Sequence, residues 1–315
     1  MATSGSTDYS ATATNVLTEA LEILQVIQSG GSIVSADETS LLRTLNMMLK
    51  QWSANFDFAP GLKVFNRKRG YLFLQQGQSA YSLGPSGDNS SLSYVSTTMR
   101  VAGIATDTTL EITSSTGMTA ADKIGIELDS GAIQWTTISV VTDGDTVTIP
   151  ASGLTGAAAA GNRVFAYTTK IQRPLLIESA SIRNTDGEDS PMWPMSLGYY
   201  ESIASKADDS TPAYYDYENS LTNGRLQLDC EPDDVTKVVR LVFMLPTEDI
   251  DAVANDIALP QEWLLPVAHG LAKLSASKFG KQWLPQDESN FTAALAMARS
   301  SYAETSDDYF QPGLD

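Results

Sequence analysis

The 315-residue chain contains one cysteine, one histidine and a net charge of −18 at pH 7. A single cysteine excludes an intrachain disulfide, and a single histidine excludes a metal site built from several histidines. The negative charge disfavours tight binding to DNA or RNA, which requires basic side chains that neutralise phosphates. Length and composition together predict a globular protein with room for two ordinary domains.

Targeting and membrane signals are weak in this sequence. Residues 1–13 are polar and lack the basic start and apolar middle of a signal peptide. The longest apolar run near the core, Leu241 to Leu245, falls far short of the roughly 20 residues that span a bilayer. We therefore expect no membrane anchor, and the lone cysteine favours folding in a reducing cytoplasm.

Two helices are predicted near the N-terminus. The first has apolar residues at three- and four-residue steps from Leu17 to Ile27, and the pair Gly30-Gly31 is expected to end it. The second is predicted to begin at Ser35, with Glu38 completing a capping box. Its Met and Trp side chains are interpreted as packing residues rather than cofactor contacts. The predicted core face of the second helix is Leu41, Leu42, Leu45, Met48, Leu49 and Trp52.

A β-hairpin is predicted after these helices. Leu62 to Phe65 and Tyr71 to Leu74 have the composition of strands, and the run from Asn66 to Gly70 between them has the composition of a turn. That turn carries Arg67, Lys68 and Arg69, so the sequence predicts a hairpin with a basic tip. A further short extended piece is expected from Gly77 to Ser82.

The segment from Val95 to Lys170 differs in composition from the rest of the chain. It is rich in Thr, Ser, Ala and Gly, and short β-like runs alternate with Gly/Asp turns. This pattern predicts an inserted all-β domain, either a sandwich or a barrel. Trp135 is its natural stacking residue for an outer-surface ligand, although a place in the core of this domain is the favoured interpretation. The predicted strands are Thr109 to Ile112, Lys123 to Leu128, Ile133 to Val141 and Thr146 to Ile149.

The remaining part of the chain mixes strands and helices. A helix is expected to open at Leu259 to Trp263 and to end at Gly280, and a last helix is expected from about Asp287 to Tyr302. A short helix is also predicted between Pro194 and Lys206. The predicted strands are Leu175 to Ile182, Pro212 to Tyr217, Arg225 to Leu228 and Val238 to Met244.

These elements predict an α+β fold with a helical-bundle core, β-hairpins and the inserted small all-β domain. The expected domain organisation has four parts. Residues 1–94 and 171–304 form the core, residues 95–170 form the insertion, and residues 305–315 form an acidic and aromatic arm.

The sequence contains no complete motif for catalysis or cofactor binding. Asn162 and Arg163 follow Gly161 where a phosphate-binding loop requires Lys and Ser or Thr. His269 is expected to be a structural histidine on a helix, and the acidic neighbours of Cys230 should suppress its thiolate. The prediction is that the protein is not an enzyme, has no catalytic residue and uses no metal or cofactor.

Six short motifs follow one another in a distinctive order. They are Leu45 to Ser53, Gly77 to Pro85, Arg173-Pro174 leading to Ile182-Arg183, Tyr199 to Ile203 followed by Lys206, Thr211 to Tyr215, and Leu259 to Trp263. In this order they resemble the phage head-to-tail adaptor family, also called tail accessory factors or packaged-DNA-stabilisation proteins of short-tailed phages. The resemblance covers residues 12–94 and 171–304.

The resemblance implies a structural virion protein of the neck and tail, made in the host cytoplasm. Such a protein forms a homo-oligomeric ring, expected to be dodecameric, that binds the portal protein, extends the DNA channel and retains the packaged DNA. Tail nozzle or hub proteins and tail fibre or spike proteins would attach to it. DNA would pass through the ring without sequence-specific binding.

Two groups of residues have expected roles in such a ring. Arg67, Lys68 and Arg69 would contact an acidic neighbouring subunit or, less favourably, DNA phosphates in the channel. The arm would dock on the portal or on a neighbouring subunit through Asp307, Asp308, Tyr309 and Phe310, although a frayed terminus is an equally open reading.

Two alternatives from other functional classes stay open. One is a carboxylate-based glycan hydrolase of a phage tail, because 38 acidic residues always allow a suitable pair somewhere in the fold. The other is a receptor- or glycan-binding tail module that uses the insertion and Trp135.

Overall fold

The computed structural model describes residues 9–55, 62 and 65–300, and the chain divides into two compact units. The first, here called the helical unit, consists of Met1–Asn66 and Pro246–Asp315. The second, here called the β unit, is Arg67–Leu245. Among the described residues, no helix has both the length and the apolar character needed to cross a membrane.

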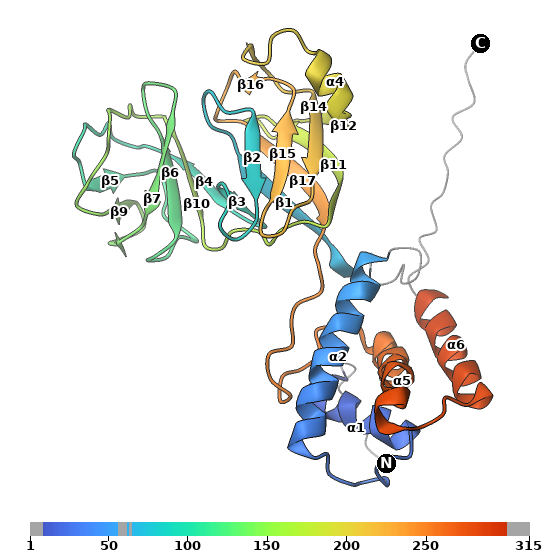
Figure 1. Cartoon of the computed structure of the whole chain (residues 1–315). Coiled ribbons are helices and arrows are strands. Elements are labelled where there is room, and N and C mark those ends of the chain that lie inside the picture. Colours follow the sequence, from blue (N-terminus) through green and yellow to red (C-terminus); the bar gives the residue numbers. More distant parts are fainter. Residues whose placement is uncertain (1–8, 56–61, 63–64, 301–315) are drawn as a thin grey trace. The chain divides into compact units, whose positions relative to one another are not determined.

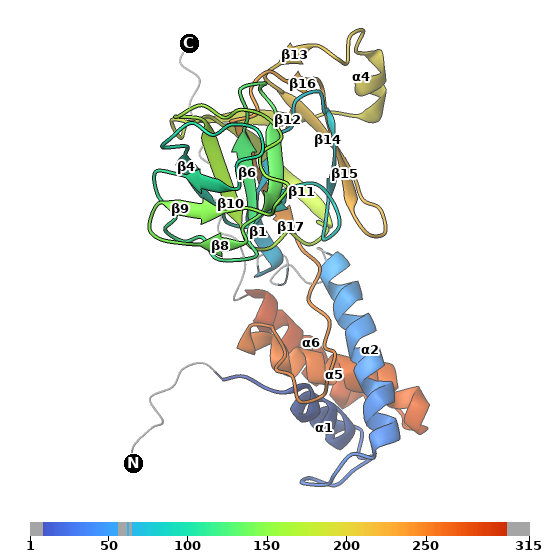
Figure 2. The same ribbon diagram turned by 90° about the vertical axis from the view of Figure 1, so that its left-hand side faces the viewer.

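The helical unit is built around one central helix. That helix, α5 (Leu264–Ser275), lies beside α1 (Ala13–Ile23), α2 (Ser35–Ala54) and α6 (Pro285–Ser300) (Figures 1 and 2). Pro266 is tolerated because it lies in the first turn of α5, where its missing N–H has no helical partner to lose. Short 3₁₀ turns, η1 (Gln261–Trp263) and η2 (Ala276–Phe279), flank α5, and Gly280 ends the second of them in the left-handed conformation.

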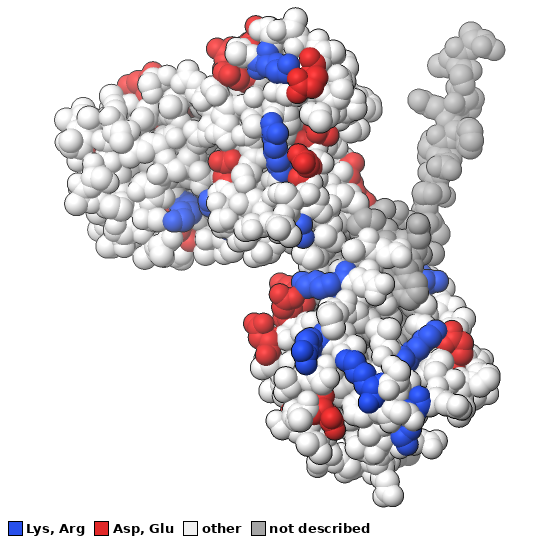
Figure 3. Space-filling model, viewed as in Figure 1, with Lys and Arg blue, Asp and Glu red and all other residues white. Residues whose placement is uncertain are grey.

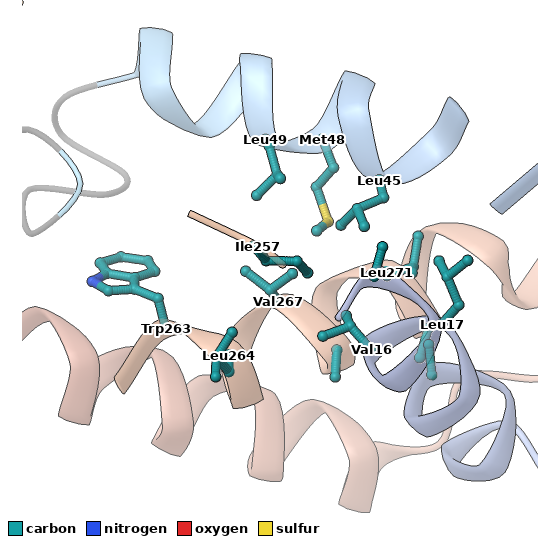
Figure 4. Close-up of a cluster of buried hydrophobic side chains, with 14 of the residues drawn as sticks. Val16, Leu17, Leu45, Met48, Leu49, Ile257, Trp263, Leu264, Val267 and Leu271 are labelled. Atoms are coloured by element: carbon teal, nitrogen blue, oxygen red, sulfur yellow. The ribbon is translucent and has the colours of Figure 1, made fainter. Parts of the chain in front are cut away.

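The core of the helical unit is formed by residues from both the N-terminal and the C-terminal part of the chain. Leu45, Met48 and Leu49 of α2 point toward Val267 and Leu271 of α5 (Figure 4). All five side chains are buried, and burial of each contributes about 1.5–3 kcal/mol relative to exposure. The prediction that the Met and Trp side chains of α2 are packing residues is therefore confirmed for Met48 and Trp52, although Met47 is exposed.

The β unit contains an eight-stranded, barrel-like sheet that is nearly closed. Its centre is β17 (Val238–Met244), which pairs antiparallel with β1 (Arg67–Phe73) on one side and β11 (Leu176–Arg183) on the other. The interior is apolar and includes Leu72, Leu226 and Leu241. The other five strands are β2 (Ala80–Leu83), β3 (Ser90–Ser91), β12 (Asp189–Pro194), β14 (Tyr214–Glu218) and β15 (Gly224–Leu228).

The segment between β3 and β11 forms two smaller sheets with a core of their own. One sheet has the order β4-β10-β6-β7 and the other β5-β9-β8. Figures 1 and 2 show these strands grouped together, and we call this segment the β module. Its strands are β4 (Val95–Thr98), β5 (Thr109–Glu111), β6 (Lys123–Glu127), β7 (Ile133–Thr137), β8 (Val140–Val141), β9 (Thr146–Thr148) and β10 (Arg163–Tyr167). The rest of the β unit contributes α4 (Leu197–Ser202), β13 (Asp209–Ser210) and β16 (Glu231–Pro232).

The predicted fold class, with a helical-bundle core, is wrong. The protein is mostly β, and only 26% of it is helical. The predicted strands from Leu175 to Met244 do occur, but they are not hairpins attached to a helical bundle. They join β1 and β2 in one large sheet with its own apolar interior, because each of these strands buries one face against the others.

The predicted hairpin with a basic tip is also wrong. The described residues Leu62, Phe65 and Asn66 are helical, and the chain then runs as one strand from Arg67 to Phe73. Gly70, which suggested a turn, lies within the strand, where β1 pairs with β17, and its lack of a side chain leaves room for the ring of Phe243. A Cβ atom at this position would lie 2.8 Å from Cε1 of Phe243.

Two predicted helix ends differ from the structure. The first helix ends at Ile23, well before Gly30, and Gln25 follows with a φ of 53°. The capping box is absent because α2 begins with Ser35 as its first helical residue and Val34 as its N-cap, which has no side-chain cap. Carboxylates at Asp37 and Glu38 still favour this end of the helix through the helix dipole.

Candidate assembly surfaces

Two hollows of the helical unit are lined by apolar side chains that remain exposed. The larger, here called the α1–α5 hollow, has a volume of about 340 Å³. Leu265 lies in it with 53% of its surface exposed, next to the buried side chains of Val16 and Leu264. The other lining residues are Tyr9, Ala11, Asn15, Glu19, Gln261 and Ala268.

The smaller hollow, here called the α2–α6 hollow, has a volume of about 210 Å³. Leu274 is its exposed apolar residue, at 49%, and Trp52 and Phe291 form an aromatic wall with ring centroids 6.3 Å apart. Lys273 adds a positive charge, although its ammonium is also 2.7 Å from a carboxylate oxygen of Glu288. The remaining lining residues are Met48, Gln51, Asn55 and Gly270.

The two hollows use opposite faces of α5. A helix turns by about 100° per residue, so residues 264, 265 and 268 share one arc of about 100°. Residues 270, 273 and 274 share another such arc, and the centres of the two arcs lie roughly half a turn apart. The helical unit therefore presents two different, partly apolar faces, which is what a head-to-tail contact between identical subunits requires.

The basic residues that were predicted at a hairpin tip lie on strand β1. The guanidinium of Arg67 is held by the carboxylate of Glu178, with Nε 2.7 Å from Oε2. Arg67 and Arg69 share one face of the strand and Lys68 lies on the other, because side chains alternate along a strand. Lys68 and Arg69 are exposed. The three charges are therefore divided between the two faces of a sheet rather than gathered at one tip.

Trp135 lies on β7 in an aromatic cluster between the β module and the large sheet. Its ring is 5.0 Å from Phe73 and 5.6 Å from Tyr167, measured between centroids. The indole also covers Gly125, where a Cβ atom would lie 2.8 Å from the ring. Trp135 is half-buried, and its indole N–H is buried without a hydrogen-bond partner among the described residues. The neighbouring rings leave little of the indole free to stack on an outer-surface ligand.

The proposed contact residues Asp307, Asp308, Tyr309 and Phe310 lie outside the described residues.

Figure 3 shows Lys and Arg side chains gathered on the face of the helical unit that carries α2 and α5 in Figure 1. An otherwise acidic chain thus presents a locally basic face, which favours an acidic partner surface.

The two residues with the most reactive chemistry are both buried. His269 lies on α5, as predicted, with 9% of its surface exposed, and its Nδ1 atom has no hydrogen-bond partner in the described part of the chain. Burial lowers the pKa of its imidazole, and the charges of Asp287 and Glu19 partly oppose that shift. Burial also raises the pKa of the Cys230 thiol, which donates to the carbonyl oxygen of Ser210 at 3.4 Å.

One hollow of the β unit contains a pair of carboxylates. Asp216 and Glu218 lie on one face of β14 and line a space of about 280 Å³ together with Leu197 and Arg225. Residues two apart on a strand are separated by roughly 7 Å. Within residues 9–55, 62 and 65–300, no group of three or more His, Cys, Asp or Glu side chains has a geometry that could hold a metal ion.

Sequence reasoning did not identify either hollow of the helical unit. The sequence pattern did contain a sign of them, since Leu265 and Leu274 are apolar residues outside the single buried stripe that a surface helix needs.

No family model matches this chain, and no curated protein matches it.

Proposed function

We propose that this protein is a head-to-tail adaptor of a phage virion, which assembles as a ring beneath the portal and extends the DNA channel. The observation that carries the proposal is the pair of hollows on opposite faces of α5. A closed ring of identical subunits needs two complementary surfaces on each subunit, because every copy contacts a different face of the next. The six ordered motifs described above point to the same role.

The arrangement of charge supports a conduit rather than a DNA-binding protein. Proteins that bind DNA tightly use a set of basic side chains on one face to displace counterions from the phosphates. Here the net charge is −18, and the cations of β1 form no such set, because Arg67 is paired with Glu178 and Lys68 and Arg69 lie on opposite faces of the strand. The basic face of the helical unit is assigned below to the portal contact and not to DNA. The proposed lumen would let DNA pass without retaining it by specific contacts, and retention would come from closing the channel below the portal.

The proposed partners are a portal protein above the ring and tail components below or around it. The portal would meet the helical unit, whose basic face suits an acidic surface. Tail nozzle, fibre or spike proteins would attach to the β unit. The dodecameric state follows only from the family resemblance and is part of the proposal.

The test uses the full chain and the portal ring of the same particle. Mass measurement of the mixture should give a complex in which several copies of this chain are bound to each portal, and electron microscopy should show added density below the portal. Particles assembled without the chain should lose their packaged DNA. A chain that remains monomeric and unbound in the presence of the portal contradicts the proposal.

A glycan hydrolase is the second candidate, and Asp216 with Glu218 is the observation in its favour. They lie on the same face of β14 with Cα atoms roughly 7 Å apart, so both carboxylates can face one ligand, as the acid and base of a glycosidase must. Arg225 lies opposite Glu218 on the next strand, however, and its guanidinium donates to the side-chain oxygen of Gln227 at 2.8 Å, so a fixed positive charge lies beside the two carboxylates. Release of reducing sugars from peptidoglycan or capsule by the wild-type chain, abolished in Asp216→Asn, would support this candidate. Equal release by both proteins would exclude this pair.

A further inference from the structure

A cavity of about 230 Å³ lies in the β unit where the β module meets the large sheet. Strands β4 and β10 contribute Ser96, Arg163 and Phe165 to its wall, and the hairpin between β11 and β12 contributes Arg183 and Asn184. Tyr94, just before β4, also lines it, and the remaining lining residues are Thr185, Gly187, Thr236 and Val238. The cavity is smaller than the roughly 300–1,000 Å³ of sites for drug-sized ligands, so it suits a single small ring.

Arg183 gives this cavity a fixed positive charge. Its Nε and one terminal nitrogen each donate to a different carboxylate oxygen of Asp189, both at 2.8 Å. Arg240 donates to the same carboxylate at 2.6 Å. Two guanidinium groups thus share one carboxylate, so the group of three carries a net charge of +1 and the Arg183 side chain is held in place.

Arg163 is the second cation of the cavity, and its charge is not neutralised. Its guanidinium donates to the carbonyl oxygen of Thr185 at 3.3 Å, and among the described residues it forms no ion pair. The carboxylate of Glu127 lies nearby but accepts from the backbone N–H of Arg163, at 2.7 Å, and not from the guanidinium. An arginine that lines a cavity and has only one long neutral hydrogen bond retains donors for an anionic group.

The rest of the wall combines an aromatic surface with neutral polar groups. Tyr94 is half-buried, and its ring lies 4.8 Å from that of Tyr71, 5.4 Å from that of Phe73 and 6.0 Å from that of Phe165, between centroids. Only the exposed part of the Tyr94 ring is therefore open to a ligand in the cavity. The side-chain amide of Asn184 and the hydroxyl of Ser96 add hydrogen-bonding groups. The side chain of Asn184 has no hydrogen-bond partner within the part of the chain that the structure describes, so both its donor and its acceptor are available.

We propose that this cavity binds an acidic sugar, meaning one pyranose residue that carries a carboxylate, as found in uronic-acid polymers of cell surfaces. The carboxylate would pair with Arg163, the apolar face of the ring would lie against Tyr94, and hydroxyl groups would bond to Asn184 and Ser96. An inorganic phosphate would use the arginines but would gain nothing from the aromatic wall. This site is distinct from the assembly surfaces of the helical unit, and it does not depend on the adaptor proposal.

The test measures binding of glucuronic acid to the full chain by ligand-observed NMR, with glucose and inorganic phosphate as separate probes. Wild-type protein should bind glucuronic acid saturably, glucose more weakly, and phosphate without displacing the sugar. Arg163→Gln should weaken glucuronic acid binding by about ten-fold or more, because a charge-assisted hydrogen bond is lost. Asn184→Ala should also weaken binding, and it removes a side chain that makes no hydrogen bond among the described residues.

Arg100→Gln is the matched control, since Arg100 is an exposed arginine of the same β module that pairs with Glu111 outside the cavity. It should bind like the wild type. Absence of saturable glucuronic acid binding to the wild type would overturn the proposal, as would unchanged binding in a folded Arg163→Gln variant. Displacement of the sugar by an equal concentration of phosphate would overturn the assignment to a sugar.

Discussion

Gly270 of α5 lies directly against the indole of Trp52 on α2. A Cβ atom at position 270 would be 2.7 Å from Cζ2 of Trp52 and 3.1 Å from the sulfur of Met48. Trp52 in turn meets Trp263 edge-on, with ring centroids 6.2 Å apart. The close approach of α2 and α5, and with it the α2–α6 hollow, therefore depends on the absence of a side chain at Gly270.

Gly270→Ala should destabilise the helical unit by about 1–3 kcal/mol, the usual cost of overpacking a core. A loss of stability would be informative, because replacing Gly by Ala within a helix otherwise stabilises it by about 0.5–1 kcal/mol. Chemical unfolding followed by circular dichroism measures the change. Gly198→Ala on the exposed helix α4 is the control, since a Cβ atom there would meet only Ser196 Oγ at 4.0 Å, and it should be neutral or stabilising.

Trp135→Ala should destabilise the β unit by about 3–5 kcal/mol, as expected for truncation of a packed aromatic side chain. The reason is its contact with Phe73 and Tyr167, which joins the β module to the large sheet. Trp193→Ala is the matched control, because Trp193 is 61% exposed, and it should change the free energy of unfolding by no more than about 0.5 kcal/mol. Equal effects of the two substitutions would contradict a packing role for Trp135.

The local pattern of this sequence predicted many individual elements but not how they pair. The strands around Val238 to Met244 and the helices from Leu264 to Ser300 follow from apolar periodicity alone. The pairing of Arg67–Phe73 with Val238–Met244 does not, because it joins segments about 170 residues apart and leaves no local signal. The predicted helical bundle was wrong for that reason.

The same limit explains the error at Gly70 and the missed surfaces. A charged run that ends in glycine is typical of a turn, and only the partner strand reveals that Gly70 makes room for Phe243. The two faces of α5 could have been found from Leu265 and Leu274, since they lie outside the buried stripe. The cavity around Arg163 could not, because its residues come from four separate parts of the sequence.

Gly70→Ala should destabilise the β unit by about 1–3 kcal/mol, because the new methyl group would meet both the ring of Phe243 and the backbone oxygen of Ser91. Phe243 is fully buried and has little freedom to move aside. Thermal unfolding provides the measurement. Gly144→Ala is the control, since no atom lies within 4 Å of a Cβ atom at that position. An equally small effect of the two substitutions would mean that Gly70 lies in an open turn and not against Phe243.

His269 should make the stability of the helical unit depend on pH near neutrality. Burial lowers its pKa in the folded chain below the unfolded value of about 6.5, so the unfolded chain binds the proton more readily. The free energy of unfolding should therefore fall as the pH drops below about 6.5, with a slope of at most about 1.4 kcal/mol per pH unit.

The comparison is with His269→Gln, which removes the titrating group. Denaturant unfolding of this variant between pH 5 and 7 should show a flatter pH dependence than the wild type, whatever its absolute stability. Identical slopes for the two proteins would mean that His269 does not titrate as its burial implies.

The central claim is that identical subunits contact one another through the two different faces of α5. Leu265→Asp should disable the α1–α5 hollow and Leu274→Asp the α2–α6 hollow, because each places a charge where an apolar contact is needed. Both side chains are about half exposed, so neither change should unfold the chain. Val34→Asp is the control, since Val34 is exposed and lines neither hollow.

The most direct measurement is chemical crosslinking of these chains on the portal ring, followed by mass analysis of the products. The wild type and Val34→Asp should give a ladder that extends to the full ring, and each hollow variant alone should give only monomers. An equal mixture of Leu265→Asp and Leu274→Asp should give dimers and nothing larger, because only one intact pair of faces can form. Dimers in either variant alone, with no gain on mixing, would contradict head-to-tail contact through α5.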